Sequence, residues 1–217
     1  SRTSADNLTE LFAWQERNQI QLISARLAHQ CLQESYLLEQ AGFRFIEMVL
    51  HPTITGLENR VDIENTGLTV GVAEAAELPI LAEAANNAFT HERFHLDPRL
   101  DNERADARYA WFIEKAFNST EQELLVVRQQ GKAVAFFVVE TSPKGVSHWY
   151  LAAILPNVQG NGLGSRAWRA MMHYHRDNGS KQITTTMSAR NSAILGLYAK
   201  LNFRFLPPEM TFHWIAA

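Results

Sequence analysis

Runs of apolar residues with spacings of two, or of three to four, predict that strands and helices alternate along the whole chain. Over the N-terminal third we expect a helix, a strand near Ile20–Leu27, a second helix, the strand FRFIEMVL, a long loop, a strand and a helix. Gly42 fits the cap between the second helix and its strand. The loop and the two elements after it are expected at residues 53–67, 68–73 and 74–89.

The C-terminal two thirds show a similar alternation. ELLVVRQ and AVAFFVVE are rich in β-branched and aromatic residues and are joined by QGK, which predicts an antiparallel hairpin. VSHWYLAAIL predicts a strand that ends at Pro156, QITTTMS predicts another, and the tail FRF…MTFHWIA predicts two short strands. Helices are expected at Asp101–Asn118, Leu163–Asn178 and Ser192–Leu201.

A short repeat links the two ends of the chain. AGFRF (41–45) and LNFRF (201–205) each follow a short predicted helix and begin a strand. The matching context predicts that the first 50 residues are a degenerate half-copy of the C-terminal unit. We therefore divide the chain into an N-terminal α/β extension, residues 1–66, and a larger domain, residues 67–217.

Composition narrows the class of protein. Of the 217 residues, 46% are hydrophobic and 20% charged, as in ordinary globular proteins with a sizeable core. The net charge of −3 argues against a nucleic-acid partner, and no apolar run is long enough to span a membrane. The single Cys31 excludes an internal disulfide framework and a cysteine-rich zinc site. A cytoplasmic protein is expected.

HERFH (residues 91–95) has the spacing by which a helix presents two zinc ligands and a general base. That chemistry needs a sustained helix and a third ligand, but Asp97-Pro98 disfavours a helix beyond Leu96. Glu103 lies across the proline-containing loop and matches the position of a third ligand poorly. A zinc peptidase is therefore disfavoured, no metal is expected, and surface or substrate-lining roles remain for these residues.

QGNGLGS (159–165) separates the strand that ends at Pro156 from an amphipathic helix. Glycines permit tight turns and the close approach of a ligand, and the unpaired N–H groups of such a loop favour a pyrophosphate. A dinucleotide fingerprint needs Gly-x-Gly-x-x-Gly, and the glycines here have the wrong interval. A P-loop needs Gly-Lys-Ser/Thr, which Gly164-Ser165-Arg166 does not supply. A turn that simply caps the helix is the remaining alternative.

The pattern Gln-x-x-Gly-x-Gly at Gln159–Gly164 resembles the pyrophosphate loop of the GCN5-related N-acetyltransferase (GNAT) superfamily. In that superfamily a strand follows the helix, and an Asn then opens a short helix that carries a Tyr and ends in Gly-Phe. TTTMSARNSAILGLYAKLNF supplies the strand, Asn191, Tyr198, and Asn202-Phe203 in place of Gly-Phe. The resemblance implies an α/β fold with a twisted, mostly antiparallel mixed sheet and helices on both of its faces.

The resemblance also implies transfer of acetyl from acetyl-CoA to a primary amine, without a metal. Tyr198 is expected to protonate the leaving thiolate, although it could be an ordinary core tyrosine. Glu140 is the candidate base, with His148 and Tyr150 as alternatives, and each could equally be a plain sheet residue. Acetyl-CoA is expected to contact Ala153, Ile154, Leu155, Gln159, Gly160, Asn161, Gly162, Leu163, Gly164, Ser165 and Asn191.

Residues 88–117 further resemble the substrate-side segment of the bacterial dTDP-fucosamine acetyltransferase family. That resemblance implies a homodimer and, as acceptor, the 4-amino group of a nucleotide-linked amino-dideoxy-sugar used for surface polysaccharide. The connection TSPKGVSHWYL departs from the family. A polyamine, peptide or antibiotic amine is an alternative acceptor, and a non-catalytic acyl-CoA-binding module is an alternative function. The expected acceptor contacts are His91, Arg93, Phe94 and His95.

Overall fold

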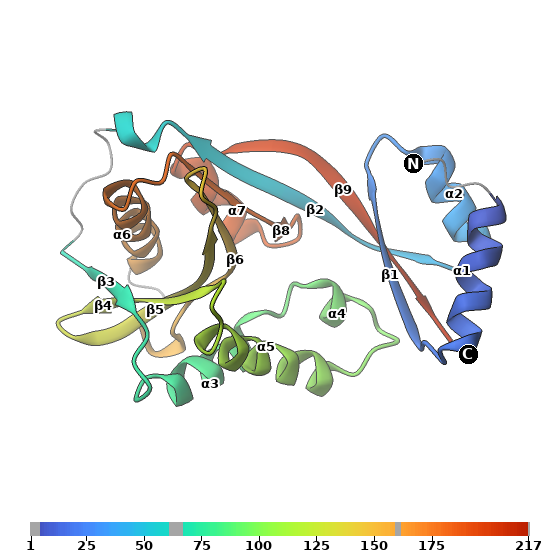
Figure 1. The fold of residues 1–217 in the computed structure, drawn as a ribbon, viewed down its shortest axis with the longest axis horizontal. Helices are drawn as coiled ribbons and strands as arrows, with labels where there is room; N and C mark the ends of the chain where they lie inside the picture. Colours follow the sequence, from blue (N-terminus) through green and yellow to red (C-terminus); the bar gives the residue numbers. More distant parts are fainter. Residues whose placement is uncertain (1–4, 61–66, 159–161, 217) are drawn as a thin grey trace.

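The computed structural model describes residues 5–60, 67–158 and 162–216, with one twisted nine-stranded sheet as its scaffold (Figure 1). The strands are β1 (Leu22–Ala28), β2 (Arg44–Thr55), β3 (Thr69–Val72), β4 (Glu123–Gln129), β5 (Lys132–Thr141), β6 (Val146–Ile154), β7 (Gln182–Thr185), β8 (Met187–Ser188) and β9 (Arg204–Ile215). Their order across the sheet is β1-β9-β2-β7-β6-β5-β4-β3, and β8 pairs with β2. All pairs are antiparallel except β6 with β7, so the mixed, mostly antiparallel sheet is confirmed.

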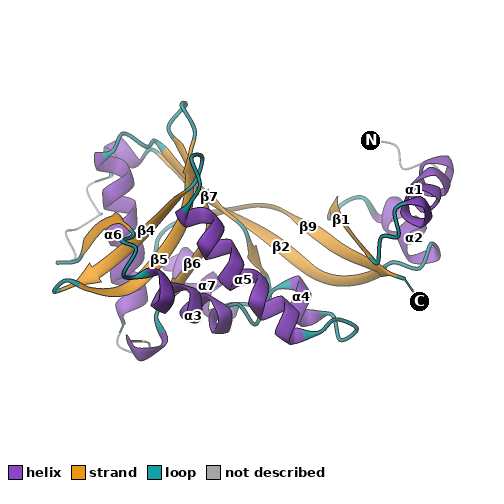
Figure 2. Ribbon diagram, turned by 60° about the horizontal axis from the view of Figure 1, so that its bottom comes forward, coloured by secondary structure: helices purple, strands orange, loops and turns teal. Residues whose placement is uncertain are grey.

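Helices cover both faces of this sheet, as expected (Figure 2). They are α1 (Ala5–Arg17), α2 (Leu32–Gln40), α3 (Leu78–Ala88), α4 (Arg93–Leu96), α5 (Asn102–Phe117), α6 (Leu163–Asp177) and α7 (Ser192–Lys200), with 3-10 turns at Leu57–Asn59 and Pro156–Val158. Helices α3 and α5 bury Leu81 and Ile113 against Phe136, whereas α6 and α7 bury Trp168 and Tyr198 near Trp149 on the other face. No helix within the described ranges is long and apolar enough to cross a membrane.

The N-terminal segment repeats the backbone hydrogen bonds of the C-terminal one. Phe43 N donates to Leu38 O at 3.0 Å, and Phe203 N donates to Tyr198 O at 3.0 Å. Helices α2 and α7 have the same length, and a left-handed residue, Gly42 or Asn202, separates each from its strand. The half-copy, in which Leu38 would occupy the place of Tyr198, stays a prediction.

The two long strands β2 and β9 carry the N-terminal unit on the main sheet (Figure 1). β1 pairs with β9, while β2 lies between β9 and β7, so both segments belong to one continuous sheet. A small core of Leu38, Phe43, Met210 and Phe212 joins them, with Phe12 of α1 packed against it. The division at residue 66 stays a prediction, because residues 61–66 lie outside the described ranges.

Two sequence expectations were wrong in this region. Thr53–Thr55 belong to β2 rather than to a loop, because they pair with β7, and Leu57 in the following 3-10 turn is fully buried. The C-terminal tail forms one strand, β9, instead of two. Pro207 and Pro208 do not end it, because they lie at a register shift between β9 and β2, where a missing N–H does not break a ladder bond.

A buried polar cluster fixes β6 against the end of α6. The Trp149 indole N–H donates to His175 Nε2 at 2.9 Å, so that nitrogen must be unprotonated. The Ser147 hydroxyl lies 3.1 Å from His175 Nδ1 and 2.7 Å from the Ser180 hydroxyl. Burial lowers the pKa of His175 to about 4 from 6.5. The neutral imidazole is therefore part of the folded structure.

The His175 cluster predicts a pH-dependent stability. Because the pKa of His175 is lower in the folded chain, the unfolded chain binds the extra proton first, and stability falls as the pH drops from 6.5 towards 4. The full loss from this group is about 3 kcal/mol. Urea unfolding at a series of pH values should show a flatter dependence for His175→Gln than for wild type, with exposed His91→Gln as the control. Parallel curves for wild type and His175→Gln would contradict the assignment.

Candidate active site

Strands β6 and β7 separate at the centre of the sheet. Their parallel pairing ends at Trp149–Thr185, and the Thr185 hydroxyl donates to the Trp149 carbonyl at 2.8 Å. Beyond that rung β6 continues to Ile154, and no strand of the described ranges pairs with this edge. A register shift against β5 leaves Tyr150 as an extra residue at the point where the strands separate. This forked edge could take an extended, peptide-like ligand.

Tyr198 of α7 lies at the fork. Its side chain is 3% exposed, its ring packs on Phe203 at 4.9 Å between centroids, and the Thr185 side chain is close to its hydroxyl. Burial raises the pKa of Tyr198, and the neighbouring Trp168 and Thr185 oppose that rise in part. The phenol is thus held protonated at neutral pH, as a proton donor must be.

The end of the glycine-rich loop is shaped for a tight turn into α6. Gly162 has φ +68° and ψ +7°, in the left-handed region, at the cap position of the helix. Leu163 is buried in the core, Gly164 lies near Leu197, and Ser165 is half-buried in the first turn. The predicted ligands Gln159, Gly160 and Asn161 lie outside the described residues. The unpaired N–H groups of the first turn of α6 therefore lie immediately after the Gly162 turn.

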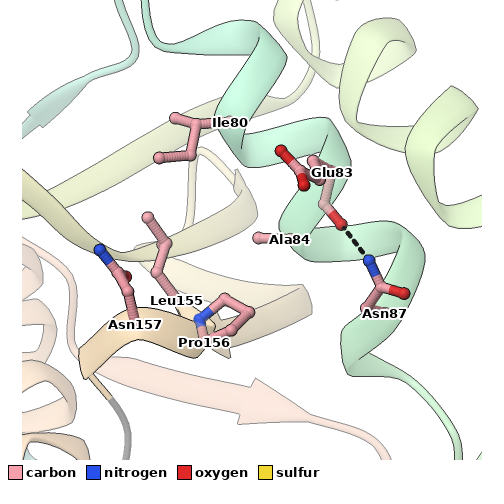
Figure 3. Close-up of a pocket in the computed structure, with 7 residues that line it drawn as sticks. All are labelled: Ile80, Glu83, Ala84, Asn87, Leu155, Pro156 and Asn157. Atoms are coloured by element: carbon pink, nitrogen blue, oxygen red, sulfur yellow. Dashed lines mark hydrogen bonds between the residues drawn. The ribbon is translucent and has the colours of Figure 1, made fainter.

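The side chains at the end of β6 are used for packing. Ala153 and Leu155 belong to the core under α3 and α5, and Ile154 packs on the opposite core. A ligand along this edge would therefore meet mainly backbone. On the α3 side, Figure 3 shows a pocket between that helix and the end of β6, and Asn87 Nδ2 donates to the Glu83 carbonyl at 3.0 Å beside it. The pocket is lined by Ile80, Glu83, Ala84, Asn87, Leu155, Pro156 and Asn157.

A polar cavity of about 270 Å³ opens on the fork from the side of α4 and α5. Both arms of the fork contribute to its wall, through Tyr150 and Leu151 of β6 and through residues 186–188. The N-terminal unit contributes Arg26, Glu47 and Val49. The remaining wall consists of Glu92, Arg93, Arg108, Tyr109, Phe112 and His148.

The ionisable groups of this polar cavity have displaced pKa values. Burial raises the pKa of Glu47 from 4.5 to about 7; neighbouring Ser188, Arg93 and Arg26 oppose the rise, and Glu92 adds to it. Burial also raises the pKa of Glu92 and lowers that of His148, so His148 is a neutral imidazole at neutral pH. Groups with displaced pKa values that share one cavity are typical of catalytic or binding sites.

The model of the acetyltransferase (GNAT) family matches residues 80–203, more than half of the chain, and its range includes the fork, the loop and Tyr198. The chain belongs to the acetyltransferase (GNAT) family. The superfamily expected from the loop motif is therefore confirmed.

Curated relatives align with part of this GNAT chain. A mycothiol acetyltransferase of Amycolatopsis mediterranei (strain U-32) is 30% identical over 112 residues, which cover 48% of this chain and 35% of the relative. A mycothiol acetyltransferase of Paenarthrobacter aurescens (strain TC1) is 28% identical over 151 residues, 65% of this chain and 45% of the relative. The chain thus spans less than half the length of these two relatives.

Solved structures show the same fold over nearly the whole chain. A functionally unknown conserved protein of Staphylococcus epidermidis superposes with a TM-score of 0.73 at 11% identity, covering 98% of this chain and 79% of that one. A GCN5-related N-acetyltransferase of Sphaerobacter thermophilus gives 0.65 at 15% identity, with 95% and 67% covered. A tandem GNAT protein from the clavulanic acid biosynthesis pathway gives 0.63 at 11% identity, with 100% and 72% covered. The fold of these proteins thus includes the N-terminal unit of this chain.

The residues of HERFH (91–95) make different contacts and do not form one metal site. His91 is exposed and precedes α4, so the two histidines do not share a helix. His95 Nε2 forms a hydrogen bond with Asp106 Oδ1 at 2.8 Å. No group of three metal-ligating side chains occurs in the described part of the chain. Of the four predicted acceptor contacts, the structure brings Arg93 to the polar cavity, but not His91, Phe94 or His95. Glu92, which was not predicted, lines the cavity with it.

The segment that carries Arg93 is tied to the N-terminal unit. Phe94 stacks on His213 of β9 with ring centroids 5.7 Å apart. The fully buried side chain of Asp97 accepts from Arg99 Nη2 at 2.7 Å and lies 3.0 Å from His213 Nδ1. Hydrogen bonds from Arg99 and His213 overcome the effect of burial and hold the pKa of Asp97 at about 2. These contacts orient the wall of the cavity.

Glu140, the predicted base, lies in a different setting from the cavity groups. Its Oε2 accepts from the Tyr150 hydroxyl at 2.7 Å, and Glu140 is not among the residues that line the polar cavity. Tyr150 does line it, and the hydrogen bond to Glu140 raises the pKa of Tyr150. A catalytic role for Glu140 stays a prediction.

Several cavity residues were missed from the sequence. Glu47 and Arg26 come from the extension, far in sequence from the loop motif, and Arg108 and Tyr109 lie on α5. Glu47 had one visible signal, because it is an acidic residue inside the apolar run FRFIEMVL. Such a residue in a strand is expected to have a buried partner or a function.

Asn191 has a structural role that a variant can separate from its predicted ligand role. Its side-chain oxygen accepts from Ile194 N at 3.1 Å and caps α7, which leaves its amide nitrogen for a ligand. Asn191→Ala should cost ~1 kcal/mol of stability through the lost cap. Asn191→Asp should keep the stability but raise KM for acetyl-CoA, since the amide donor is gone. An unchanged KM in Asn191→Asp, measured beside thermal unfolding, would leave Asn191 as a helix cap alone.

Proposed function

We propose that this GNAT chain transfers the acetyl group of acetyl-CoA to a primary amine of a small molecule. The proposal rests on one observation, which is that three features of the structure lie close together. The strand edge that opens after Trp149–Thr185, the buried phenol of Tyr198 and the polar cavity all meet at one fork. A thioester bound along β6 would face an amine in the cavity.

The residues present fit acetyl-CoA. Gly162 in the left-handed conformation brings the N–H groups of the first turn of α6 to one place, where a pyrophosphate would be bound. The edge of β6 near Ala152–Leu155 would bind the amides of the pantetheine arm, because its side chains are already packed in the two cores. When bound, acetyl-CoA supplies an activated acetyl group and a thiolate leaving group.

Proton movements follow from the same geometry. The thiolate needs a proton as it leaves, and we assign its donation to the phenol of Tyr198, whose raised pKa keeps it protonated. The amine must be neutral to attack, so a base must accept its proton. His148 is neutral and lines the cavity, whereas Glu140 lies behind Tyr150. Both stay candidates in this proposal.

Two similarities to other acetyltransferases suggest acceptors, and they indicate different amines. The relatives named mycothiol acetyltransferase favour an acceptor related to mycothiol. The resemblance of residues 88–117 to the dTDP-fucosamine acetyltransferase family favours a nucleotide-linked amino sugar. Polyamines, peptides and antibiotic amines are further members of an acceptor screen. A homodimer and a cytoplasmic location stay predictions from the sequence.

Loss of the thioester absorbance of acetyl-CoA, followed across these amines, tests the activity itself. Turnover with at least one amine is expected, together with the acetylated product by mass spectrometry. Saturable binding of acetyl-CoA without turnover of any amine would instead support the non-catalytic acyl-CoA-binding module.

Substitution of Tyr198 tests the proton donor. Tyr198→Phe keeps the ring that packs on Phe203 but removes the hydroxyl, so kcat should fall roughly 100-fold, while thermal unfolding changes little. Tyr36→Phe, at an exposed position of α2, is the matched control. Full activity of Tyr198→Phe would show that Tyr198 is an ordinary core residue.

Substitution of Gly162 tests the pyrophosphate turn. An alanine at φ +68° is strained by ~1 kcal/mol, and it displaces the N–H groups that the proposal assigns to acetyl-CoA. Gly162→Ala should therefore weaken acetyl-CoA binding in calorimetry. Gly56→Ala has the same strain at φ +70° with free space around it and should leave binding unchanged. Equal affinities of the two variants would place the cofactor elsewhere.

A further inference from the structure

Glu47 is a buried carboxyl group that faces the polar cavity. It is 1% exposed, and neither of its side-chain oxygens makes a hydrogen bond of good geometry within the described chain, although the Ser188 side chain lies near enough to oppose in part the rise of its pKa. A bulge produces this arrangement. Phe45 pairs with Phe212 and Glu47 with Thr211, so Ile46 is an extra residue that shifts the following side chains. A buried carboxyl group that is left unpaired is costly, so its presence at a cavity wall indicates a ligand that completes it.

A second unpaired group lies in the same wall. Arg93 Nε is buried and has no hydrogen-bond partner among the described residues, although the guanidinium lies within electrostatic reach of Glu47. Arg26 and Arg108 bring two further positive charges to the cavity, and Glu92 brings a second carboxyl group. Cations and carboxyl groups thus face the same space, and the Glu47 oxygens accept no hydrogen bond from the Arg93 guanidinium.

We propose that the polar cavity selects an amine that also carries an anionic group such as a phosphate. Glu47 would take the ammonium end, and Arg93, with Arg26 and Arg108, would take the anionic end. A guanidinium fork suits a phosphate or carboxylate, and a carboxylate suits an ammonium. The binding of such a molecule needs no acetyl-CoA. Only the role of Glu47 in the acetyl transfer rests on the proposed function.

Glu47 can then act as the base that the reaction requires. It accepts one proton from the bound ammonium group, and the neutral nitrogen bonds to the acetyl carbon while the carbon–sulfur bond breaks. The departing sulfur takes the proton of the Tyr198 hydroxyl, and the nitrogen gives up its second proton as the amide forms, which restores the Tyr198 phenol. The groups that affect the protonation of Glu47 are Arg26 of β1, Glu92 and Arg93 at α4 and Ser188 of β8. Arg108 and Tyr109 of α5 and His148 of β6 line the same cavity.

Three sugars that differ by one group each test the binding claim on the full chain. Glucosamine 6-phosphate has both the amine and the anion, glucosamine lacks the phosphate, and glucose 6-phosphate lacks the amine. In calorimetry, the first should bind tighter than either of the others by roughly tenfold or more, as expected for a lost hydrogen bond to a charged group. Equal or absent binding of all three would overturn the proposal, whether or not any amine is acetylated.

Variants assign the two ends of the ligand. Glu47→Gln should remove the preference for glucosamine 6-phosphate over glucose 6-phosphate, and Arg93→Gln should remove its preference over glucosamine. Glu39→Gln and Arg44→Gln, at exposed positions of the same N-terminal unit, should keep both preferences. Both preferences surviving in Glu47→Gln and Arg93→Gln would overturn the assignment.

A stability measurement shows independently whether Glu47 is the buried, unpaired group described. Its pKa is higher in the folded chain, so wild type should lose melting temperature relative to Glu47→Gln as the pH rises from 4.5 through 7. A constant difference between the two proteins would contradict this. With any acceptor that the wild type acetylates, Glu47→Gln should also lower kcat roughly 100-fold and remove the rise of activity near neutral pH. If His148→Gln removes that rise and Glu47→Gln does not, the base is His148 and the role of Glu47 in proton transfer is wrong.

Discussion

The pairing of β2 with β9 is the interaction on which the rest of the molecule depends. These strands join the N-terminal unit to the family fold, and β2 continues into contact with β7 and β8 beside the fork. Without this pairing, Arg26 and Glu47 would be absent from the cavity, and Phe94 and Asp97 would lose the His213 side chain on which they rest. The sheet therefore positions both the scaffold and the wall of the polar cavity.

The N-terminal and C-terminal segments, which we predict to be related halves, differ in their chemistry. Both keep a helix, a left-handed cap residue and a strand joined by the same hydrogen bonds. The C-terminal half carries the phenol of Tyr198, where the N-terminal half has the apolar Leu38. Since Leu38 has no proton to donate, the N-terminal half contributes to the site in another way: it supplies charged groups, above all Glu47, to the cavity of the C-terminal half.

Sequence periodicity predicted most of the elements, and the resemblance to the GNAT superfamily predicted the loop and Tyr198, because these features depend on residues close to one another in the chain. It failed where distant segments decide the outcome. The C-terminal tail was expected to form two strands but forms one, because a shift in pairing with β2 accommodates Pro207 and Pro208. The residues that line the polar cavity were largely missed for the same reason: the spacing of His91 and His95 suggested a site there, whereas Glu47 reaches the cavity through a bulge and a sheet pairing that only the folded chain shows.

A crystal structure with acetyl-CoA and an amine acceptor would test most directly whether thioester and amine meet at the fork between β6 and β7. We expect the pantetheine arm along β6 beyond Trp149, with the acetyl carbonyl between Tyr198 and the polar cavity and the amine beside Glu47. An acetyl group directed into the pocket beside Ile80 and Ala84, or an acceptor bound away from Glu47 and Arg93, would contradict that expectation.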